Sequence, residues 1–315
     1  MPIETTVVGS FPKLNKPLEE AIRDVVDLQL HYGIDLITDG ELRGNMIQYF
    51  EQIPGLERLG DGLRIVGQVE PIEQDRIDEF YRIKDFRAVR SILEDMGRES
   101  VKVKVEVTGP MTLGTICASS DVDSTLKSYN LDEEGALYSD FSRALLPVVQ
   151  KALEVGAYVQ IDEPLLSTGQ VSLESAGKVL KDFASSLPSF AIEEGRVLCH
   201  VCGSIKSVAG LYDVLLGLDI PILSLGFSGE KERENFDVIS RTSFEEHGKK
   251  LAAGFISNIS VEDESVVMER YKRIEEIVGR ENIRYVQPDC GFRLTPIKKV
   301  RLILERMKAV RDRII

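Results

Sequence analysis

The sequence predicts an α/β protein that folds as one (β/α)8 TIM barrel. Short apolar or β-branched runs alternate with segments of helical periodicity, and this alternation is typical of a parallel sheet. The runs number eight, which is the number that closes such a barrel. Polar residues follow most of the runs, where a barrel gathers the residues of its active site. A doubly wound sheet is the alternative, but the glycine-rich phosphate fingerprint that would favour it does not follow the first run.

The composition agrees with one large folded unit. The chain has 315 residues, of which 43% are hydrophobic and 29% are charged. This length suits a domain with a sizeable core, and single α/β barrels often reach it. We therefore expect residues 1–315 to form one domain with an insertion at about residues 51–100.

The charge and the cysteine content exclude several classes of protein. The net charge is −13, which repels nucleic acids and anionic membranes, so neither is an expected partner. We expect no signal peptide at the N-terminus, and the sequence has no run of ~20 apolar residues that spans a membrane. Four cysteines do not make a disulfide framework, and we therefore expect a cytoplasmic protein.

The first two strands are expected before residue 42. A β-branched run that is broken by glycine and proline predicts a strand at residues 5–12. Apolar residues then recur with a helical period over residues 17–32. The second strand is expected at residues 36–41, and it ends in Asp39, Gly40 and Glu41.

The stretch at about residues 51–100 is too long for an ordinary loop. It contains charge-rich turns, a hairpin pattern at residues 63–69 and a helical pattern near residues 86–96. We interpret it as an insertion that is placed to cover the site.

The rest of the chain alternates strands with helices. Residues 101–107 alternate cleanly between valine and charged residues, as a strand does, and Gly109 and Pro110 end the run. The later strands are expected at residues 101–110, 158–164, 196–202, 220–227, 251–257 and 283–290. The helices between and after them are expected at residues 131–155, 173–186, 205–216, 233–248, 262–278 and 296–312.

One imidazole and two thiols form the candidate metal site. His200 and Cys202 are two residues apart in a strand, so they share a face, while Cys199 points to the other side. Cys290 lies at the end of another predicted strand, so a barrel brings all three ligands to one end. His and Cys side chains of this kind bind zinc. The ordinary alternative is a buried cysteine beside a core histidine, and a redox pair of Cys199 and Cys202 is weaker because strand geometry separates the two sulfurs.

A zinc ion held by two thiolates suits a thiol substrate better than water activation, because the anionic ligands reduce its Lewis acidity. This points to alkyl transfer to sulfur. Glu41 and Asp162 are candidates to hold a substrate ammonium group, and the backbone of Val8 to Ser10, with the Ser10 hydroxyl, is a candidate to hold a carboxylate. The alternative for each residue alone is a turn or helix-cap role.

Six motifs occur in a fixed order from residue 5 to about residue 293. They are Val8-Gly9-Ser10-Phe11-Pro12, Gly40-Glu41-x-Arg43-x-Asn45-Met46 with Tyr49-Phe50, Thr108-Gly109-Pro110, Gln160-Ile161-Asp162-Glu163-Pro164, His200-Val201-Cys202 and Pro288-Asp289-Cys290-Gly291. Together they make the chain resemble the catalytic half of the cobalamin-independent methionine synthase family. The resemblance implies a (β/α)8 barrel, a zinc ion and homocysteine as the methyl acceptor. The implied zinc ligands are His200, Cys202 and Cys290, and the implied homocysteine ligands are Val8, Ser10, Glu41 and Asp162.

The chain departs from the family at the fourth zinc ligand. The family has a glutamate at the end of the sixth strand, where this chain aligns Gly226. The expected site therefore has three protein ligands plus water or a thiol, unless Glu230 reaches in. A three-ligand site of this kind resembles those of methyltransferases that act on coenzyme M, so coenzyme M is the alternative acceptor. The presence of Glu41 and Asp162 favours an acceptor with an ammonium group, which coenzyme M lacks.

A second departure concerns the methyl donor. The family has a proposed proton donor, a histidine, after the seventh strand, and this chain has none in residues 254–259. A folate leaving group needs a proton at nitrogen, whereas a corrinoid leaves as cobalt(I) and needs none. The chain resembles the short family members of archaea and anaerobic bacteria, which lack the additional N-terminal barrel. We therefore expect a methylcorrinoid donor, either free methylcobalamin or a corrinoid protein. The remaining alternative is a non-catalytic paralog that binds zinc or a thiol.

Overall fold

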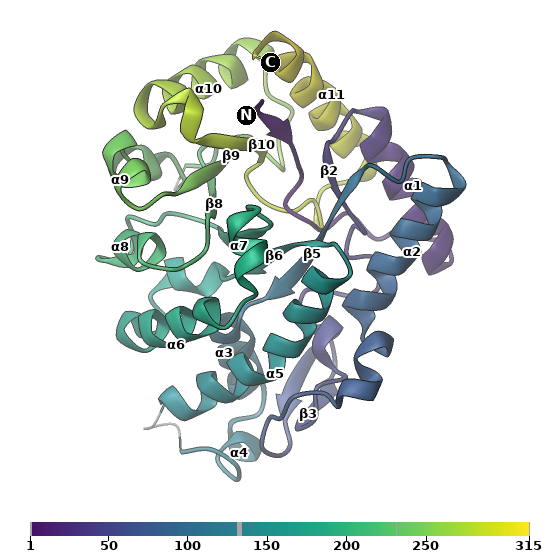
Figure 1. Cartoon of the computed structure of the whole chain (residues 1–315), viewed down its shortest axis with the longest axis vertical. Coiled ribbons are helices and arrows are strands. Elements are labelled where there is room, and N and C mark those ends of the chain that lie inside the picture. Colours follow the sequence, from purple (N-terminus) through teal and green to yellow (C-terminus); the bar gives the residue numbers. More distant parts are fainter. Residues whose placement is uncertain (1, 131–133, 231, 315) are drawn as a thin grey trace.

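The computed structural model describes residues 2–130, 134–230 and 232–314, and its centre is a barrel of parallel strands (Figure 1). Eight strands form one sheet in the order β1-β10-β9-β8-β7-β6-β5-β2. A parallel bridge between Thr6 and Leu36 joins the two edges of this sheet, so the barrel is nearly closed. The strands are β1 Glu4–Thr5, β2 Leu36–Thr38, β5 Lys102–Thr108, β6 Tyr158–Asp162, β7 Val197–Val201, β8 Ile222–Gly226, β9 Lys250–Ile256 and β10 Ile283–Pro288. The (β/α)8 TIM barrel prediction is confirmed.

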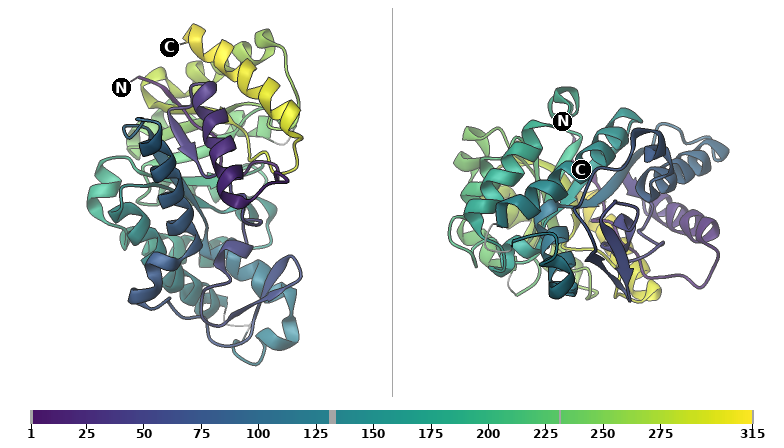
Figure 2. Two further views of the ribbon diagram at one scale, coloured as in Figure 1. Left: turned by 90° about the vertical axis from the view of Figure 1, so that its right-hand side faces the viewer. Right: turned by 90° about the horizontal axis from the view of Figure 1, so that it is seen from below.

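Helices surround the sheet, as the two views of Figure 2 show. The α-helices are α1 Leu18–His31, α2 Tyr81–Asp95, α3 Pro110–Ser120, α4 Val122–Thr125, α5 Glu134–Glu154, α6 Leu173–Ser185, α7 Ser189–Glu193, α8 Leu211–Leu216, α9 Arg241–Glu246, α10 Glu264–Val278 and α11 Ile297–Ile314. Short 3-10 helices lie at η1 Gln48–Phe50, η2 Gln74–Glu79, η4 Pro164–Thr168, η5 Glu232–Asp237 and η6 Arg280–Asn282. Within the described ranges, no helix is both long and apolar enough to cross a membrane.

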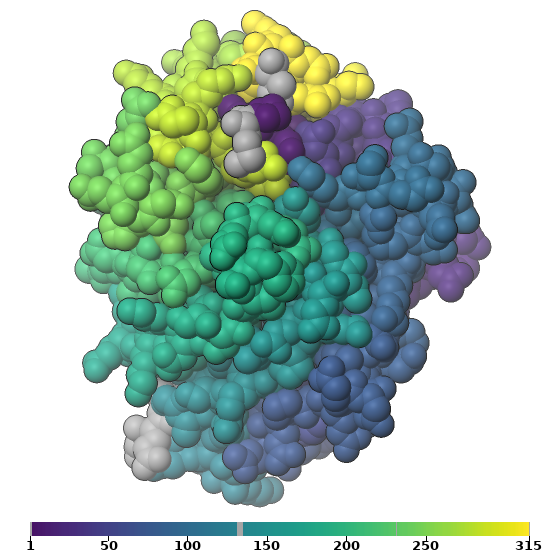
Figure 3. Space-filling model, viewed as in Figure 1, coloured from purple at the N-terminus to yellow at the C-terminus, as the bar shows by residue number. Residues whose placement is uncertain are grey.

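The first strand is shorter than predicted. Only Glu4–Thr5 pairs as a strand with β10, and residues 7–12 run on as irregular chain. The expected strand at residues 5–12 is wrong beyond Thr6 because buried side chains, and not a neighbouring strand, take up the carbonyl groups of residues 7–9. In Figure 3 the purple N-terminal segment lies against the yellow C-terminal elements, in agreement with the β1–β10 pairing.

The stretch at residues 51–100 divides into two parts. The first holds an antiparallel hairpin, β3 Leu56–Leu59 and β4 Gly62–Ile65, which begins earlier than the predicted hairpin at residues 63–69. The second is α2, which packs against α1 and β5 and serves as a helix of the barrel. The hairpin packs against α3, away from β1 (Figure 1). The one-domain organisation of residues 1–315 remains a prediction.

Two helices between β5 and α5 were not expected. The prediction placed one helix at residues 131–155, whereas α3 begins directly after β5, at Pro110, and α4 follows it. Residues 131–133 of the predicted helix lie outside the described residues. Pro110 at the first helical position is a recognisable start signal, but the β-branched residues and glycine of the helix mask its period. The predicted helices at residues 205–216 and 233–248 are also shorter or divided in the structure.

The barrel interior is apolar at one end only. One small apolar cluster is separate from the large core between strands and helices. It comprises Leu36, Leu198, Ile222, Ala252 and Tyr285. Nearer the carboxyl ends of the strands, alternate positions carry buried polar side chains. They are Thr38, Lys104, Glu106, Gln160, Asp162, His200, Ser224 and Gln287. The polar part of the interior therefore opens toward the barrel end that carries active sites.

Glu163, which follows β6, forms hydrogen bonds with the N-terminus of α3. Its carboxylate accepts hydrogen bonds from the backbone N–H groups of Met111 (2.9 Å) and Thr112 (2.8 Å), and from the Thr112 hydroxyl (2.6 Å). An added Cβ at Gly109 would lie 2.2 Å from Glu163 Oε1, so only glycine fits beneath the carboxylate. Helix N-termini favour such negative charge. Glu163 thus links two strand ends that border the polar interior.

We predict that Glu163→Gln lowers the free energy of unfolding by about 1–3 kcal/mol, because an amide NH2 would face the N–H donors of α3. Chemical denaturation at pH 8 measures the change. The control is Glu94→Gln on the exposed face of α2, which should change stability by less than about 0.5 kcal/mol. Equal effects of the two substitutions would show that the cap contributes no specific stability.

Candidate functional site

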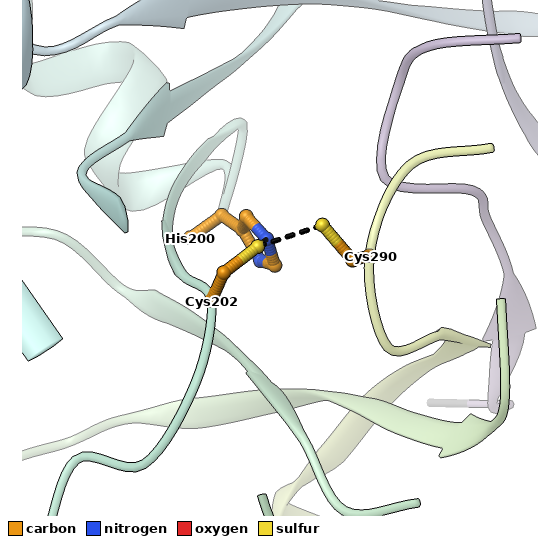
Figure 4. A group of neighbouring side chains, drawn as sticks. All are labelled: His200, Cys202 and Cys290. Carbon is orange, nitrogen blue, oxygen red and sulfur yellow. Dashed lines mark hydrogen bonds between the residues drawn. The ribbon is translucent and has the colours of Figure 1, made fainter. Parts of the chain in front are cut away.

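The three expected metal ligands converge at the carboxyl ends of β7 and β10 (Figure 4). His200 Nε2 lies 2.8 Å from Cys202 Sγ, and Cys202 Sγ lies 2.7 Å from Cys290 Sγ. All three donor atoms lie within 4.8 Å of one another, and this is the one His, Cys, Asp and Glu cluster of ligand geometry in the described part of the chain. Cys199 is buried in the outer core, on the opposite face of β7, as expected.

The donor set fits a zinc ion. Zinc–ligand lengths of about 2.0–2.3 Å place the donors of a tetrahedral site roughly 3.6–3.8 Å apart. The observed His200–Cys202 and Cys202–Cys290 contacts are closer than this by about 1 Å. The neighbouring Cys202 thiol lowers the pKa of Cys290 well below its ordinary value. A thiolate is the form of cysteine that binds metals.

Ser224 orients the imidazole. His200 Nδ1 lies 2.8 Å from Ser224 Oγ and 3.2 Å from the Ser224 carbonyl oxygen. Gln287 Nε2 donates to Ser224 Oγ at 2.7 Å and so fixes the hydroxyl. A proton on Nδ1 can then be donated to Ser224, which leaves Nε2 as the neutral nitrogen that faces the cysteines. This is the second contact that metal-binding histidines commonly make.

The segment from Val8 to Ser10 lies over the polar interior with its carbonyl groups engaged. The Val8 carbonyl accepts hydrogen bonds from Lys104 and Gln160, and the Ser10 carbonyl accepts one from the Phe292 N–H. The Gly9 carbonyl accepts a hydrogen bond from a threonine hydroxyl of β2. The donors of the segment are its N–H groups and the Ser10 hydroxyl, and their binding of a ligand stays a prediction. Donors of this kind suit a carboxylate.

Asp162 lies at the end of β6, beside His200 in the neighbouring strand. Gln160 Nε2 donates to Asp162 Oδ1 at 2.7 Å, and Gln160 Oε1 accepts from Lys104 Nζ at 2.6 Å. Burial raises the pKa of Asp162 to about 7. A nearby positive charge, such as a substrate ammonium, would favour the ionised carboxylate.

Glu41 is held in an unusual conformation by a buried partner. It has φ +52° and is the one non-glycine residue with positive φ in the described ranges. Such a conformation costs about 1 kcal/mol or more and is concentrated at functional sites. Arg82 Nη2, from α2, forms an ion pair with Glu41 Oε1 at 2.5 Å, and its guanidinium stacks 3.6 Å from the Tyr49 ring centroid. Glu41 is therefore close to the site, but its charge is already matched.

An acidic side chain from a nearby loop lies beside Gly226, the position aligned with the family's fourth ligand. The Cγ atom of Glu232 lies 3.0 Å from the point that a Cβ at Gly226 would occupy. Glu230, the residue considered from the sequence, is exposed on the same loop. Asp289 anchors this loop by accepting hydrogen bonds from the N–H groups of Phe227 and residues 228–229. Glu232 is thus the acidic side chain of the loop that lies beside Gly226.

The loop after β9 carries Asn258 and, as the sequence shows, no histidine. Asn258 Nδ2 donates to the Gly291 carbonyl at 2.8 Å and so links this loop to the one that carries Cys290. Residues 254–259 contain no side chain that transfers a proton near neutral pH.

Several residues of the site were not anticipated from the sequence. They are Arg82, Lys104, Glu106, Gln160, Ser224, Glu232 and Gln287. The alternation in β5 was a signal for two of them, because its charged positions share one face. Charged residues on one face of a strand usually indicate that this face is exposed to solvent. In β5 they line the barrel interior instead.

Comparison with known proteins identifies the family. The model of the family described as "Cobalamin-independent synthase, Catalytic domain" matches residues 12–312. A methionine synthase of Methanothermobacter marburgensis is 30% identical over 300 residues, which are 93% of this chain and 87% of that protein. A methionine synthase of Methanocaldococcus jannaschii is 29% identical over 98% of this chain and 99% of its own length.

A solved structure supports the fold. The B12-independent methionine synthase from Shewanella sp. W3-18-1, in complex with selenomethionine, superposes with a TM-score of 0.71 at 18% identity, and the match covers 100% of this chain and 98% of that one. At this identity the likeness concerns the fold alone. The assignment of the chain to a family rests on the family match and on the archaeal relatives. The chain is a methyltransferase enzyme that belongs to the family of the cobalamin-independent synthase catalytic domain.

Proposed function

We propose that this chain is a zinc-dependent S-methyltransferase that converts homocysteine to methionine. The observation that carries the proposal is the convergence of His200, Cys202 and Cys290 beside the acidic side chain of Asp162. The names of the archaeal relatives support homocysteine as the acceptor. Selenomethionine, which is bound in the Shewanella structure, is an analogue of the product.

In the proposed function His200, Cys202 and Cys290 hold zinc, which supplies a Lewis acid that keeps a thiol as its thiolate at neutral pH. Ser224 orients the imidazole through Nδ1. The N–H groups of Val8 to Ser10 and the Ser10 hydroxyl face the carboxylate of homocysteine, and Asp162 faces its ammonium. These contacts place the sulfur end of the substrate toward the metal ligands.

The methyl donor that we propose is a methylcorrinoid, either free or on a corrinoid protein. The support is chemical: residues 254–259 lack a proton donor for a nitrogen leaving group, and cobalt(I) leaves without a proton. The second candidate is a methylfolate, which the family's description as cobalamin-independent favours. One assay with both donors distinguishes these candidates.

We predict that Cys290→Ala and His200→Ala each abolish stoichiometric zinc binding, because each removes one of three protein donors. Metal analysis of purified protein after dialysis measures zinc per chain. Cys117→Ala is the matched control, because that buried thiol lies on α3 outside the site, and it should keep the full zinc content. Full zinc retention in both site variants would contradict the ligand assignment.

We predict methionine formation from homocysteine and methylcobalamin at one zinc per chain, with little turnover of coenzyme M. Chromatographic detection of the methylated thiol measures both reactions. Methylfolate tested in parallel should give no product. Product from methylfolate alone would replace the corrinoid with the second donor candidate, and product from coenzyme M alone would contradict the acceptor. Zinc binding without product from any pair would indicate the non-catalytic paralog.

We predict that Asp162→Asn weakens homocysteine binding by about tenfold or more, because an ionic hydrogen bond to the ammonium is lost. 4-Mercaptobutyrate, the same thiol without the amino group, should change by less than about threefold. The pKa of Asp162 is raised to about 7, so its negative charge increases between about pH 6 and 8. The preference of the wild type for homocysteine should therefore increase over this range, as measured by titration calorimetry. Equal losses for both thiols would count against the contact.

A further inference from the structure

The buried carboxylate of Glu106 lacks a hydrogen-bond partner in the part of the chain that the structure describes. Both of its oxygen atoms are buried, and neither forms a hydrogen bond within the described ranges. Glu106 is on β5, level with Gln160 of β6 and one alternate position below the level of Asp162. A buried carboxylate without a partner is strongly unfavourable, and such groups usually have an ion or ligand that the protein alone does not supply.

Lys104 is the nearest cation, but its donors are already committed. Its Nζ atom is 3.9 Å from Glu106 Oε1, which is too far for a hydrogen bond. Lysine has three N–H donors. They are used by the carbonyls of Val7 (2.6 Å) and Val8 (3.1 Å) and by Gln160 Oε1 (2.6 Å). Lys104 therefore lies near Glu106 without satisfying it.

A second buried cation near Glu106, Arg82, has a different acid as its partner. Arg82 forms its ion pair with Glu41. Near Glu106 the structure thus buries the acids Asp39, Glu41 and Asp162 and the two cations Arg82 and Lys104. The buried acids outnumber these cations, and Glu106 and Asp162 belong to adjacent strands.

The carboxylate of Glu106 lies directly against the segment proposed to hold the substrate. A Cβ added at Gly9 would lie 2.7 Å from Glu106 Cγ and 3.0 Å from its Cδ. Gly9 is the central residue of Val8–Ser10, whose N–H groups face the carboxylate of an amino acid in the proposed function. The α-ammonium of an amino acid is attached to the same carbon as its carboxylate, so it would come close to Glu106.

We infer that Glu106 binds the α-ammonium group of the amino-acid substrate together with Asp162, and so makes the site specific for thiols that carry an amino group. This inference rests on the proposed function. Burial raises the pKa of Glu106 well above its ordinary value when no ligand is present. Binding of the ammonium group stabilises the ionised carboxylate of Glu106. A proton on this carboxyl group is then released to solvent.

Glu106→Gln tests the inference, because it removes the charge and keeps the size of the side chain. The dissociation constants of homocysteine and 4-mercaptobutyrate are measured by titration calorimetry on zinc-loaded protein. The ratio of the two constants is used, because it does not depend on the fraction of active protein. We expect the preference for homocysteine to fall about tenfold or more, which corresponds to the loss of one ionic hydrogen bond.

The matched control is Asp140→Asn. Asp140 is a buried acid of α5 that accepts a hydrogen bond from Tyr129 outside the barrel interior, so its change should leave the preference unaltered. An unchanged preference in Glu106→Gln would overturn the inference. If that variant does not fold, Glu106→Asp is the second test, because its side chain is one methylene shorter and holds the carboxylate farther from the substrate. This variant should also reduce the preference for homocysteine. An unaltered ratio of the two constants would overturn the inference equally. Failure of the wild type to bind homocysteine would instead contradict the proposed function.

Discussion

The site depends on the ammonium group of one buried lysine. Lys104 holds the carbonyl groups of Val7 and Val8, and it fixes the amide of Gln160 so that its NH2 end donates to Asp162. Its burial lowers its pKa, since the charged form loses hydration. The three hydrogen bonds and the surrounding acids offset that loss. One side chain thus determines the path of the chain after β1 and the direction in which Asp162 presents its free oxygen.

The buried charges around Lys104 favour a ligand that carries a positive charge. The described barrel interior has more buried acids than buried cations, and a zinc ion bound by two thiolates adds no net charge. In the proposed function an amino-acid thiol supplies a cation for the acids and a carboxylate for the N–H groups near Ser10. The proposed metal ligands lie at the ends of β7 and β10, beside the polar part of the barrel interior. In this proposal the buried acids and the N–H groups bind the amino-acid end of the substrate, and the neighbouring metal site binds its sulfur.

The sequence was sufficient for the barrel and for the meeting of His200, Cys202 and Cys290, because both follow from strand alternation and from the common end of parallel strands. It was not sufficient for the path of residues 7–12, whose carbonyl groups bind side chains from distant strands. Nor did it indicate Arg82, which reaches Glu41 from a helix 41 residues away. The Lys104–Gln160 contact joins residues 56 apart and is likewise a product of the folded structure. The local sequence pattern locates the ends of strands. Contacts between side chains of distant strands and helices form only when the barrel closes.

The central claim is that the three metal ligands hold zinc where the homocysteine sulfur can join them. X-ray absorption at the zinc edge, recorded with and without homocysteine, tests this most directly because it counts sulfur neighbours of the metal. Two sulfur neighbours are predicted for the protein alone and three after homocysteine is added. A count that stays at two with saturating homocysteine would contradict the account.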